Sequence, residues 1–444
     1  MTTKTKTKKT AQRRLAEQVL THITASPTAY HVVANMIRRL EDAGFTGLPE
    51  EERWQLAPGG RYYVTRNGSS IIAFTIPGRD FRGYQIIASH SDSPSFRIKE
   101  NPEMEAAGYL RLNVERYGGM LCAPWFDRPL SIAGRVVVRG RDGALETRLI
   151  QPDRDLLMLP SLAIHMNREA NDGMKYNAQT DMLPLFGEAA DKGRFRALLA
   201  SEAGVPEQDI LSDDLYLVVR QAPSFWGAEE QYFSSPRLDD QECAWCSLEG
   251  FLAADNEEQV MLHCVLDNEE VGSRTRQGAA STFLQSVLVR IGESLGRDGQ
   301  DYHTALASSF MVSADNAHAV HPAHPDKADP VHRPRMNGGI VLKYAANQNY
   351  TTDGVSAAVV RDLCLREKIP LQTFFNRSDQ PGGSTLGNIS NTQVSLMAAD
   401  IGLAQLAMHS PYETAGVSDV GALVDFCRAF YRAGAPRIRE TCHS

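Results

Sequence analysis

Apolar and polar residues follow one another along the chain in two rhythms, which together predict both strands and helices. Four short apolar runs have the length and composition of buried strands, at 86–89, 260–266, 308–312 and 338–345. Longer segments with helical periodicity lie between or beside them, at 11–23, 26–43, 279–294 and 417–432. Strands at 62–64 and 71–76 flank an Asn67-Gly68 turn, which is a strong hairpin signal. The pattern predicts an α/β domain with a mixed sheet.

The character of the pattern changes between residues 100 and 235. Strand-like segments occur at 131–139 and 145–150 across an Asp142-Gly143 turn, and again at 215–220. Paired strands with little α/β alternation predict a separate β-rich domain inserted into the first one. The chain is therefore expected to divide into three parts, namely a basic, disordered tail at 1–10, an α/β domain formed by 11–99 and 236–444, and the inserted domain at 100–235.

Composition agrees with this division and excludes some functions. A chain of 444 residues is too long for one ordinary core, and its 42% hydrophobic and 23% charged residues are typical of globular proteins. The net charge of −8 argues against nucleic-acid binding, which needs a basic face. No apolar run approaches the roughly 20 residues of a membrane span, and no signal-peptide pattern opens the chain. Seven sparse cysteines suggest a reducing compartment, so we expect a cytoplasmic protein.

Two adjacent glutamates, Glu269 and Glu270, follow the apolar run 260–266 at the point where the predicted strand should end. Ligands bind at the carboxyl ends of strands in open α/β sheets, and unpaired buried carboxylates are costly. Because neighbouring residues in extended chain point to opposite sides, one glutamate could hold a metal while the other handles a proton. From this segment alone, an exposed acidic loop is an equally good interpretation.

Further ionisable side chains stand at the ends of other predicted strands. His90 ends one such strand, and Asp92 lies two residues on, where a carboxylate can orient a metal-binding histidine through its second ring nitrogen. Asp315 follows another strand, and His409 follows an apolar stretch near the end of the chain. Asp239 precedes a predicted helix, where helix capping is the alternative to a ligand role.

Five of these residues form a nitrogen and oxygen ligand set suited to zinc, cobalt or manganese, namely His90, Asp239, Glu270, Asp315 and His409. A single catalytic zinc typically keeps three protein ligands, so five predict two ions that share one carboxylate. Two divalent ions and three carboxylates leave a charge of about +1, which favours a bridging hydroxide, because metals lower the pKa of water to roughly 7. Glu269 is then the free neighbour that can shuttle the proton.

Five ordered motifs contain these residues, namely H-S-D-S-P at 90–94, R-L-D-D at 237–240, D-N-E-E-V-G-S at 267–273, S-A-D-N-A-H-A-V-H-P at 313–322 and A-M-H-S at 407–410. With these motifs, the sequence resembles the aspartyl aminopeptidase family of metallopeptidases. Two more segments match the family's inserted domain, W-F-D-R-P-L at 125–130 and L-A-I-H-M-N-R at 162–168. Five motifs in this order are far more specific than any one of them.

The resemblance implies two zinc ions in each subunit. It assigns the ligands as follows: His90 and Asp315 on one ion, Glu270 and His409 on the other, and Asp239 bridging both. It makes Glu269 the general base. It also implies a peptidase domain interrupted by a dimerisation domain, and a closed tetrahedral assembly of twelve subunits built from dimers.

Two more residues gain a role from the resemblance alone. By pattern, His165 is a core histidine, whereas the resemblance implies that it reaches into a neighbouring subunit's site and steadies the oxyanion of the tetrahedral intermediate. By pattern, Lys343 is as easily a solvated lysine on an edge strand. The resemblance implies that it faces the side chain of the substrate's first residue, where an ammonium would attract a carboxylate.

The sequence therefore predicts a cytoplasmic zinc metalloaminopeptidase that removes N-terminal residues, preferably aspartate or glutamate, from peptides. Cobalt or manganese could substitute for zinc. A related dinuclear hydrolase, such as a carboxypeptidase or a deacylase, is the alternative within the enzyme class. A cage-forming or cargo-binding protein with a spent site is the alternative outside it, although none of the proposed ligands has been replaced.

Overall fold

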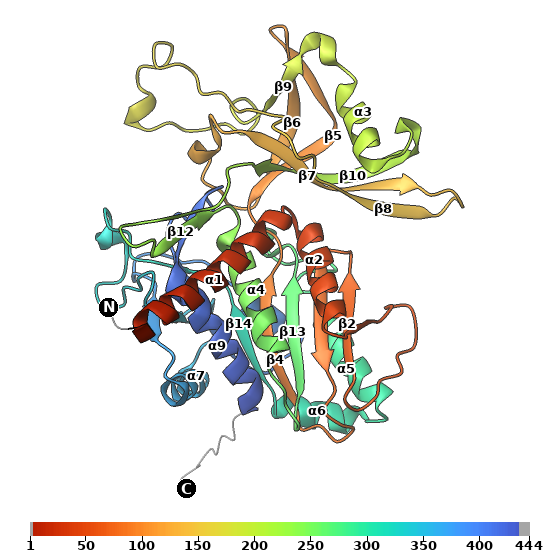
Figure 1. Ribbon diagram of the computed structural model, residues 1–444, viewed down its shortest axis with the longest axis vertical. Helices are drawn as coiled ribbons and strands as arrows, with labels where there is room; N and C mark the ends of the chain where they lie inside the picture. Colours follow the sequence, from red (N-terminus) through yellow and green to blue (C-terminus); the bar gives the residue numbers. More distant parts are fainter. Residues whose placement is uncertain (1–2, 435–444) are drawn as a thin grey trace.

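Two sheets lie at opposite ends of the molecule in the computed structural model, which describes residues 3–434 (Figure 1). The lower sheet has nine strands in the order β1-β2-β3-β13-β4-β14-β18-β16-β17. In that order their bounds are Thr46–Gly47, Arg61–Arg66, Ser70–Thr75, Val260–Leu266, Tyr84–His90, Phe310–Ala314, Met397–Gly402, Ile340–Tyr344 and Leu371–Phe375. Strands β13, β4, β14 and β18 run parallel, whereas β3 pairs antiparallel with β13 and β16 pairs antiparallel with β18. The predicted mixed α/β sheet is confirmed.

Helices cover both faces of this sheet. One face carries α1 (Thr3–Ala25), α2 (Ala29–Asp42), α4 (Leu238–Leu252), α7 (Gly354–Glu367) and α9 (Val417–Ala433), and the other carries α5 (Phe283–Ser294) and α6 (Gly299–Ala307). Alternate side chains of β13 pack into two different hydrophobic cores, because successive side chains of a strand point to opposite faces of the sheet. Met261 and Val265 pack with the first group of helices, and Leu262 and Cys264 pack with α5. This double burial explains the unbroken apolar run of β13.

The upper sheet is antiparallel and forms a separate core. Its strands follow the order β8-β7-β10-β5-β6-β9, with bounds Leu145–Ile150, Leu130–Arg139, Ile210–Val219, Ser95–Ala106, Tyr109–Tyr117 and Leu185–Glu188. Helix α3 (Arg194–Ala203) packs against it. The strands of this sheet extend from 95 to 219. Strand β12 (Tyr232–Ser235) pairs with β11 (Ser224–Trp226) on one side and with β20 (Glu413–Gly416) on the other, and its Phe233 is buried in the core of the lower body.

Two short strands complete the fold, β15 (Ala317–His318) and β19 (Ala404–Gln405), and α8 (Leu386–Ser390) is a single short helix. The predicted hairpin between β2 and β3 is confirmed, with Asn67 and Gly68 both in the left-handed conformation that a tight turn of this type requires. No helix among residues 3–434 is both long enough and apolar enough to span a bilayer.

Both N-terminal helices begin elsewhere than expected. Helix α1 starts at Thr3, so it continues through most of the segment predicted as a disordered tail, and only residues 1 and 2 of that segment lie outside the described residues. The segment contains no glycine or proline that would stop a helix from propagating. Helix α2 starts after Thr28 rather than at Ser26, whose hydroxyl instead accepts a hydrogen bond from Asn35.

Candidate active site

The ends of three parallel strands place four of the predicted residues at one edge of the lower sheet. Strands β13, β4 and β14 are neighbours, so their carboxyl ends meet at the same edge, and β13 points towards the upper domain (Figure 1). His90 is the last residue of β4, and Asp315 directly follows β14. Glu269 and Glu270 follow β13 in a single 3₁₀ turn. The strand-end positions inferred from sequence therefore converge in space.

Asp239 and His409 reach the same edge from other parts of the chain. Asp239 lies in the first turn of α4, but its backbone is not helical, with φ −79° and ψ 110°, and its peptide bond to Asp240 is cis. Its side chain caps no helix, so the capping interpretation is wrong. His409 sits in a turn that Ser410 closes by a backbone hydrogen bond to Ala407. The turn is possible because His409 adopts a left-handed conformation, with φ 65°.

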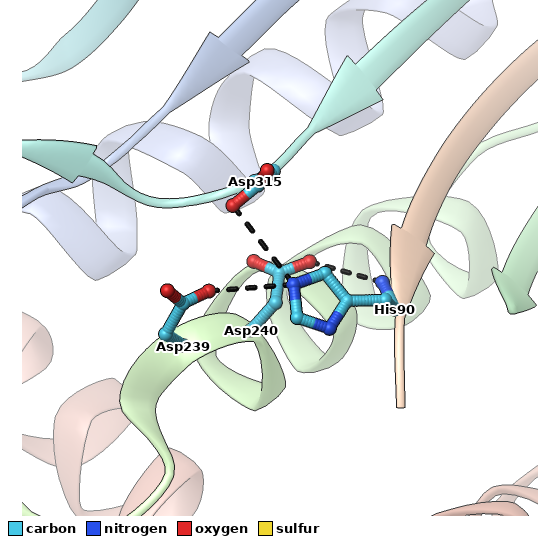
Figure 2. A group of neighbouring side chains, drawn as sticks. All are labelled: His90, Asp239, Asp240 and Asp315. Atoms are coloured by element: carbon cyan, nitrogen blue, oxygen red, sulfur yellow. Dashed lines mark hydrogen bonds and ion pairs between the residues drawn. The ribbon is translucent and has the colours of Figure 1, made fainter. Parts of the chain in front are cut away.

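The five predicted ligands form two half-sites that share Asp239. His90 Nε2 lies 3.4 Å from Asp239 Oδ1 and 4.0 Å from Asp315 Oδ1 (Figure 2). His409 Nε2 lies 3.5 Å from Asp239 Oδ2 and 3.4 Å from Glu270 Oε2. Each oxygen of the Asp239 carboxylate therefore faces a different histidine. This is the arrangement that a bridging carboxylate needs.

The donor set fits divalent cations. The Asp239 side chain is buried, and Glu270 Oε1 and Asp240 Oδ1 are buried oxygens with no hydrogen-bond partner among the described residues. Burial and then the neighbouring Asp239 carboxylate raise the pKa of Glu270 well above its usual value. Burial lowers the pKa of His90, but hydrogen bonds to Asp239 and Asp92 outweigh it and raise that pKa well above the usual value. Burying several carboxylates together is costly unless positive charge lies nearby, and divalent ions would supply that charge.

Asp92 fixes the residues of the first half-site through its hydrogen bonds. His90 Nδ1 lies 3.4 Å from Asp92 Oδ1 and 3.1 Å from the Asp92 backbone oxygen, which leaves Nε2 free to face the ligand cluster. The Asp92 carboxylate also accepts hydrogen bonds from the backbone amides of Glu269 (3.1 Å) and Glu270 (3.2 Å). Tyr117, from the upper sheet, donates a third hydrogen bond of 2.7 Å. Asp92 thus fixes a histidine and both glutamates at once.

Two buried carboxylates that the sequence analysis missed also shape the site. Glu413 Oε2 accepts a hydrogen bond from the Asp239 backbone amide (3.0 Å), and Glu413 Oε1 accepts one from the His409 amide (2.7 Å). Asp240 Oδ2 accepts a hydrogen bond from the His90 amide (3.1 Å). Asp240 also falls within a metal-binding group with His90, Asp239 and Asp315. The signal in the sequence was adjacency, since Asp240 follows one predicted ligand and Glu413 stands four residues after another.

Lys343 is buried in the interior of the lower sheet. Its strand β16 lies between β18 and β17, so the edge-strand interpretation is wrong. The ammonium donates hydrogen bonds to the backbone oxygens of Asp315 (2.8 Å) and Asn316 (3.2 Å), and it lies 3.8 Å from Asp315 Oδ2. Burial lowers the pKa of Lys343, but the Asp315 carboxylate outweighs it and raises that pKa above the usual value. A charged ammonium therefore lies directly beside a predicted metal ligand.

His165 lies apart from this cluster. It sits in the loop between β8 and β9 of the upper domain, and it is exposed, so the core-histidine interpretation is wrong. None of the metal-binding groups found among residues 3–434 includes it. Leu162, Ile164 and Met166 on the same loop are also exposed. The candidate site formed within one chain therefore does not include His165.

Comparison with known proteins gives a consistent result. A family model described as "Aminopeptidase I zinc metalloprotease (M18)" matches residues 22–431. A protein of Clostridium acetobutylicum named "Probable M18 family aminopeptidase 2" is 44% identical over 413 residues, which are 91% of this chain and 95% of that protein. A protein of the same name from Ectopseudomonas mendocina is 42% identical over 429 residues, which are 95% of this chain and 98% of that protein.

Solved structures give the same picture. The "Cryo-EM structure of the Ape4 and Nbr1 complex" matches with a TM-score of 0.92 and 36% identity, over 96% of this chain and 86% of that one. The "Crystal structure of prApe1" matches with a TM-score of 0.89 and 30% identity, over 94% of each chain. The "Structure of S. cerevesiae mApe1 dodecamer" matches with a TM-score of 0.83 and 29% identity, over 94% of this chain and 96% of that one.

Proposed function

Because the chain belongs to the M18 family of zinc aminopeptidases, we propose that it cleaves N-terminal aspartate and glutamate from peptides with the help of two metal ions. The shared carboxylate carries this proposal, since Asp239 offers one oxygen towards His90 and the other towards His409. A site for one ion would have no use for two half-sites facing opposite oxygens of one carboxylate. We assign zinc to both, with cobalt or manganese as substitutes, because the donors are all nitrogen and oxygen.

Each ion would be held by three protein groups. We assign the ligands in two sets that share Asp239: His90 and Asp315 for the first ion, Glu270 and His409 for the second. When bound, two such ions would activate a water for attack and polarise the scissile carbonyl. The chain's own contribution is to fix these ligands, and Asp92 and Glu413 do so by holding backbone amides on both sides of the cluster.

Glu269 is the group that we assign to proton transfer. Its carboxylate would take a proton from the attacking water and pass it to the leaving amine. Burial raises the pKa of Glu269 to about 8, ahead of an opposing effect of cationic His90. Divalent ions nearby would lower this pKa towards neutrality, where a general base is most efficient. Glu270, by contrast, lies 3.4 Å from His409 and belongs with the ligands.

Lys343 is the residue to which we assign substrate selection. Its ammonium is desolvated, and three of its neighbours are oxygens from the segment that carries Asp315. In such surroundings a substrate carboxylate would be attracted, and a lysine or arginine side chain would be repelled. The ammonium lies at the same strand-end edge as the ligands, where the first residue of a bound peptide has to sit.

The assembly that we propose is a tetrahedral dodecamer built from dimers, in which His165 of one subunit enters the site of its neighbour. A dodecamer is described for one of the structures that this chain resembles. The exposed loop that carries His165 also exposes Leu162, Ile164 and Met166, and apolar side chains gathered on one loop are typical of a protein interface. We also propose a cytoplasmic location, because every cysteine among residues 3–434 is a free thiol.

Metal analysis combined with turnover of a small set of amide substrates tests the function. We expect two zinc ions per chain and faster cleavage of aspartyl and glutamyl amides than of the leucyl amide. Acetylation of the substrate's α-amino group should abolish cleavage, because an aminopeptidase needs a free N-terminus. Cleavage of acetylated or C-terminal substrates would instead identify a deacylase or a carboxypeptidase. Absence of turnover with both ions bound would favour a cage protein with a spent site.

Mixed oligomers test the shared site. His165→Ala and Glu269→Gln subunits should each be nearly inactive alone, yet co-expression should restore activity. A random mixture makes half of the dimers mixed, and one site in each has both groups intact, so we expect roughly one quarter of wild-type activity if sites are shared across a two-fold interface. Differently tagged subunits allow the mixed species to be isolated and assayed. Activity no higher than the sum of the two variants would count against a shared site.

A further inference from the structure

A second buried carboxylate, Asp400, lies beside Lys343. The two residues are directly opposite one another in the antiparallel register of β16 and β18. Opposite residues in such a pair place their side chains on the same face of the sheet. Asp400 is fully buried, and among the described residues no lysine or arginine forms an ion pair with it within 4.0 Å. The groups in direct contact with its carboxylate are hydrogen-bond donors, which a buried carboxylate needs.

Those hydrogen bonds come from two loops that are separate in the sequence. The 345–353 loop connects β16 to α7, and the 376–385 loop, rich in glycine, connects β17 to α8. From the first loop, Thr351 donates its backbone amide (2.5 Å) and its hydroxyl (2.6 Å) to Asp400 Oδ2. From the second loop, Thr385 donates its hydroxyl to Oδ1 (2.5 Å). The Asp400 amide in turn donates to the Thr352 hydroxyl (2.9 Å).

Both loops that Asp400 holds help to form the surroundings of Lys343. Tyr350, next to Thr351, places its ring 5.2 Å from Lys343 Nζ, within the range of a cation–π contact. Thr385 immediately precedes α8, where Gly387 comes so close that a Cβ there would lie 3.0 Å from Asp400 Oδ1. The Asp400 carboxylate thus links Tyr350, whose ring covers the Lys343 ammonium, to the end of the 376–385 loop.

We propose that Asp400 is a positioning residue for substrate selection, which holds the 345–353 and 376–385 loops in the arrangement that fits an acidic side chain to Lys343. This inference rests on the proposed function, in which Lys343 recognises that side chain. Asp400 acts through the threonines and does not touch the substrate itself. If a loosened pair of loops is competent for only a fraction of the time, the apparent affinity falls by that fraction. The effect should therefore appear in KM, while kcat stays close to wild type.

Matched threonine variants separate the hydroxyl from the side-chain shape. Thr385→Val keeps the shape but removes the hydrogen bond, whereas Thr385→Ser keeps the hydroxyl, and the same pair can be made at Thr351. For Asp400→Asn and Thr385→Val we expect KM for an aspartyl amide to rise about tenfold, the low end for losing a hydrogen bond to a charged group. We expect kcat within about twofold of wild type, unchanged zinc content, and near-normal KM in the serine variants.

Several results would overturn the inference. Equal losses with aspartyl and leucyl amides, or a loss of zinc, would show that Asp400 only supports the fold. Serine variants as impaired as the valine variants would show that the hydroxyls are not the anchors. Hydrogen exchange in the two loops gives a readout that needs no substrate, and Asp400→Asn should speed exchange there in particular. If the enzyme does not prefer acidic residues but the loops still loosen, the substrate assignment is wrong and the anchoring is right. Unchanged exchange would refute the anchoring itself.

Discussion

Glu269→Gln is expected to retain both zinc ions and to lose about 10²–10⁴-fold in turnover, the usual contribution of a general base. The amide has the shape of the carboxylate but cannot accept a proton. The backbone around it should not move, because Asp92 holds the amides of Glu269 and Glu270, and the substitution leaves both hydrogen bonds in place. Zinc content by elemental analysis and kcat on an aspartyl amide are the two measurements.

Glu270→Gln is the matched control, since the two glutamates are adjacent and the substitution is identical. Glu270 Oε2 lies 3.4 Å from His409 Nε2, and its other oxygen is buried with no hydrogen-bond partner among residues 3–434. We therefore expect this variant to bind zinc less tightly, and added zinc should restore part of its activity. If Glu269→Gln loses zinc and Glu270→Gln keeps it, the roles of the two residues have been exchanged.

The sequence predicted the position of several candidate residues at strand ends, where a local signal marked it. His90, Glu270 and Asp315 each come at or just after the end of an apolar run, and β13 was predicted with its observed bounds. Parallel neighbouring strands end at one edge, so residues at strand ends converge whatever the connections between them. Strand-end position is a property of a short segment, and a short segment can be read from sequence. The mixed sheet followed from the same runs.

Contacts between distant segments could not be predicted in this way. Glu413 reaches the Asp239 amide across 174 residues of sequence, and nothing in the periodicity of either segment indicates that contact. Strand order is equally invisible to periodicity, which is why Lys343 could be taken for an edge residue although β16 lies between two other strands. The interpretation of His165 as a core histidine was wrong for a related reason. Its apolar neighbours Leu162 and Ile164 are exposed on a loop, and a short run of apolar residues has the same pattern on a loop as in a core.

The position of Lys343 gives it a structural role, which experiment must separate from the substrate recognition that we propose for it. Its ammonium supports the backbone oxygens of Asp315 and Asn316, so a neutral replacement would leave two buried acceptors without a donor. Such a loss commonly costs about 1–3 kcal/mol and would disturb a segment that carries a proposed ligand. That effect would be the same for every substrate. The recognition of an acidic side chain, in contrast, would be lost only for aspartyl and glutamyl peptides.

Lys343→Leu should accordingly lower kcat/KM for aspartyl and glutamyl peptides by at least about 30-fold, because truncating one partner of a buried charge pair commonly costs 2–5 kcal/mol. Leucyl peptides should lose little beyond the common structural effect, or even gain, so the ratio between the two substrates isolates recognition from support. Lys343→Met, which keeps the length of the side chain without its charge, should change the ratio in the same direction. Zinc content measured on each variant reports the structural effect separately. If aspartyl and leucyl substrates fall together in both variants, Lys343 supports the Asp315 segment and the acidic preference must arise from other residues.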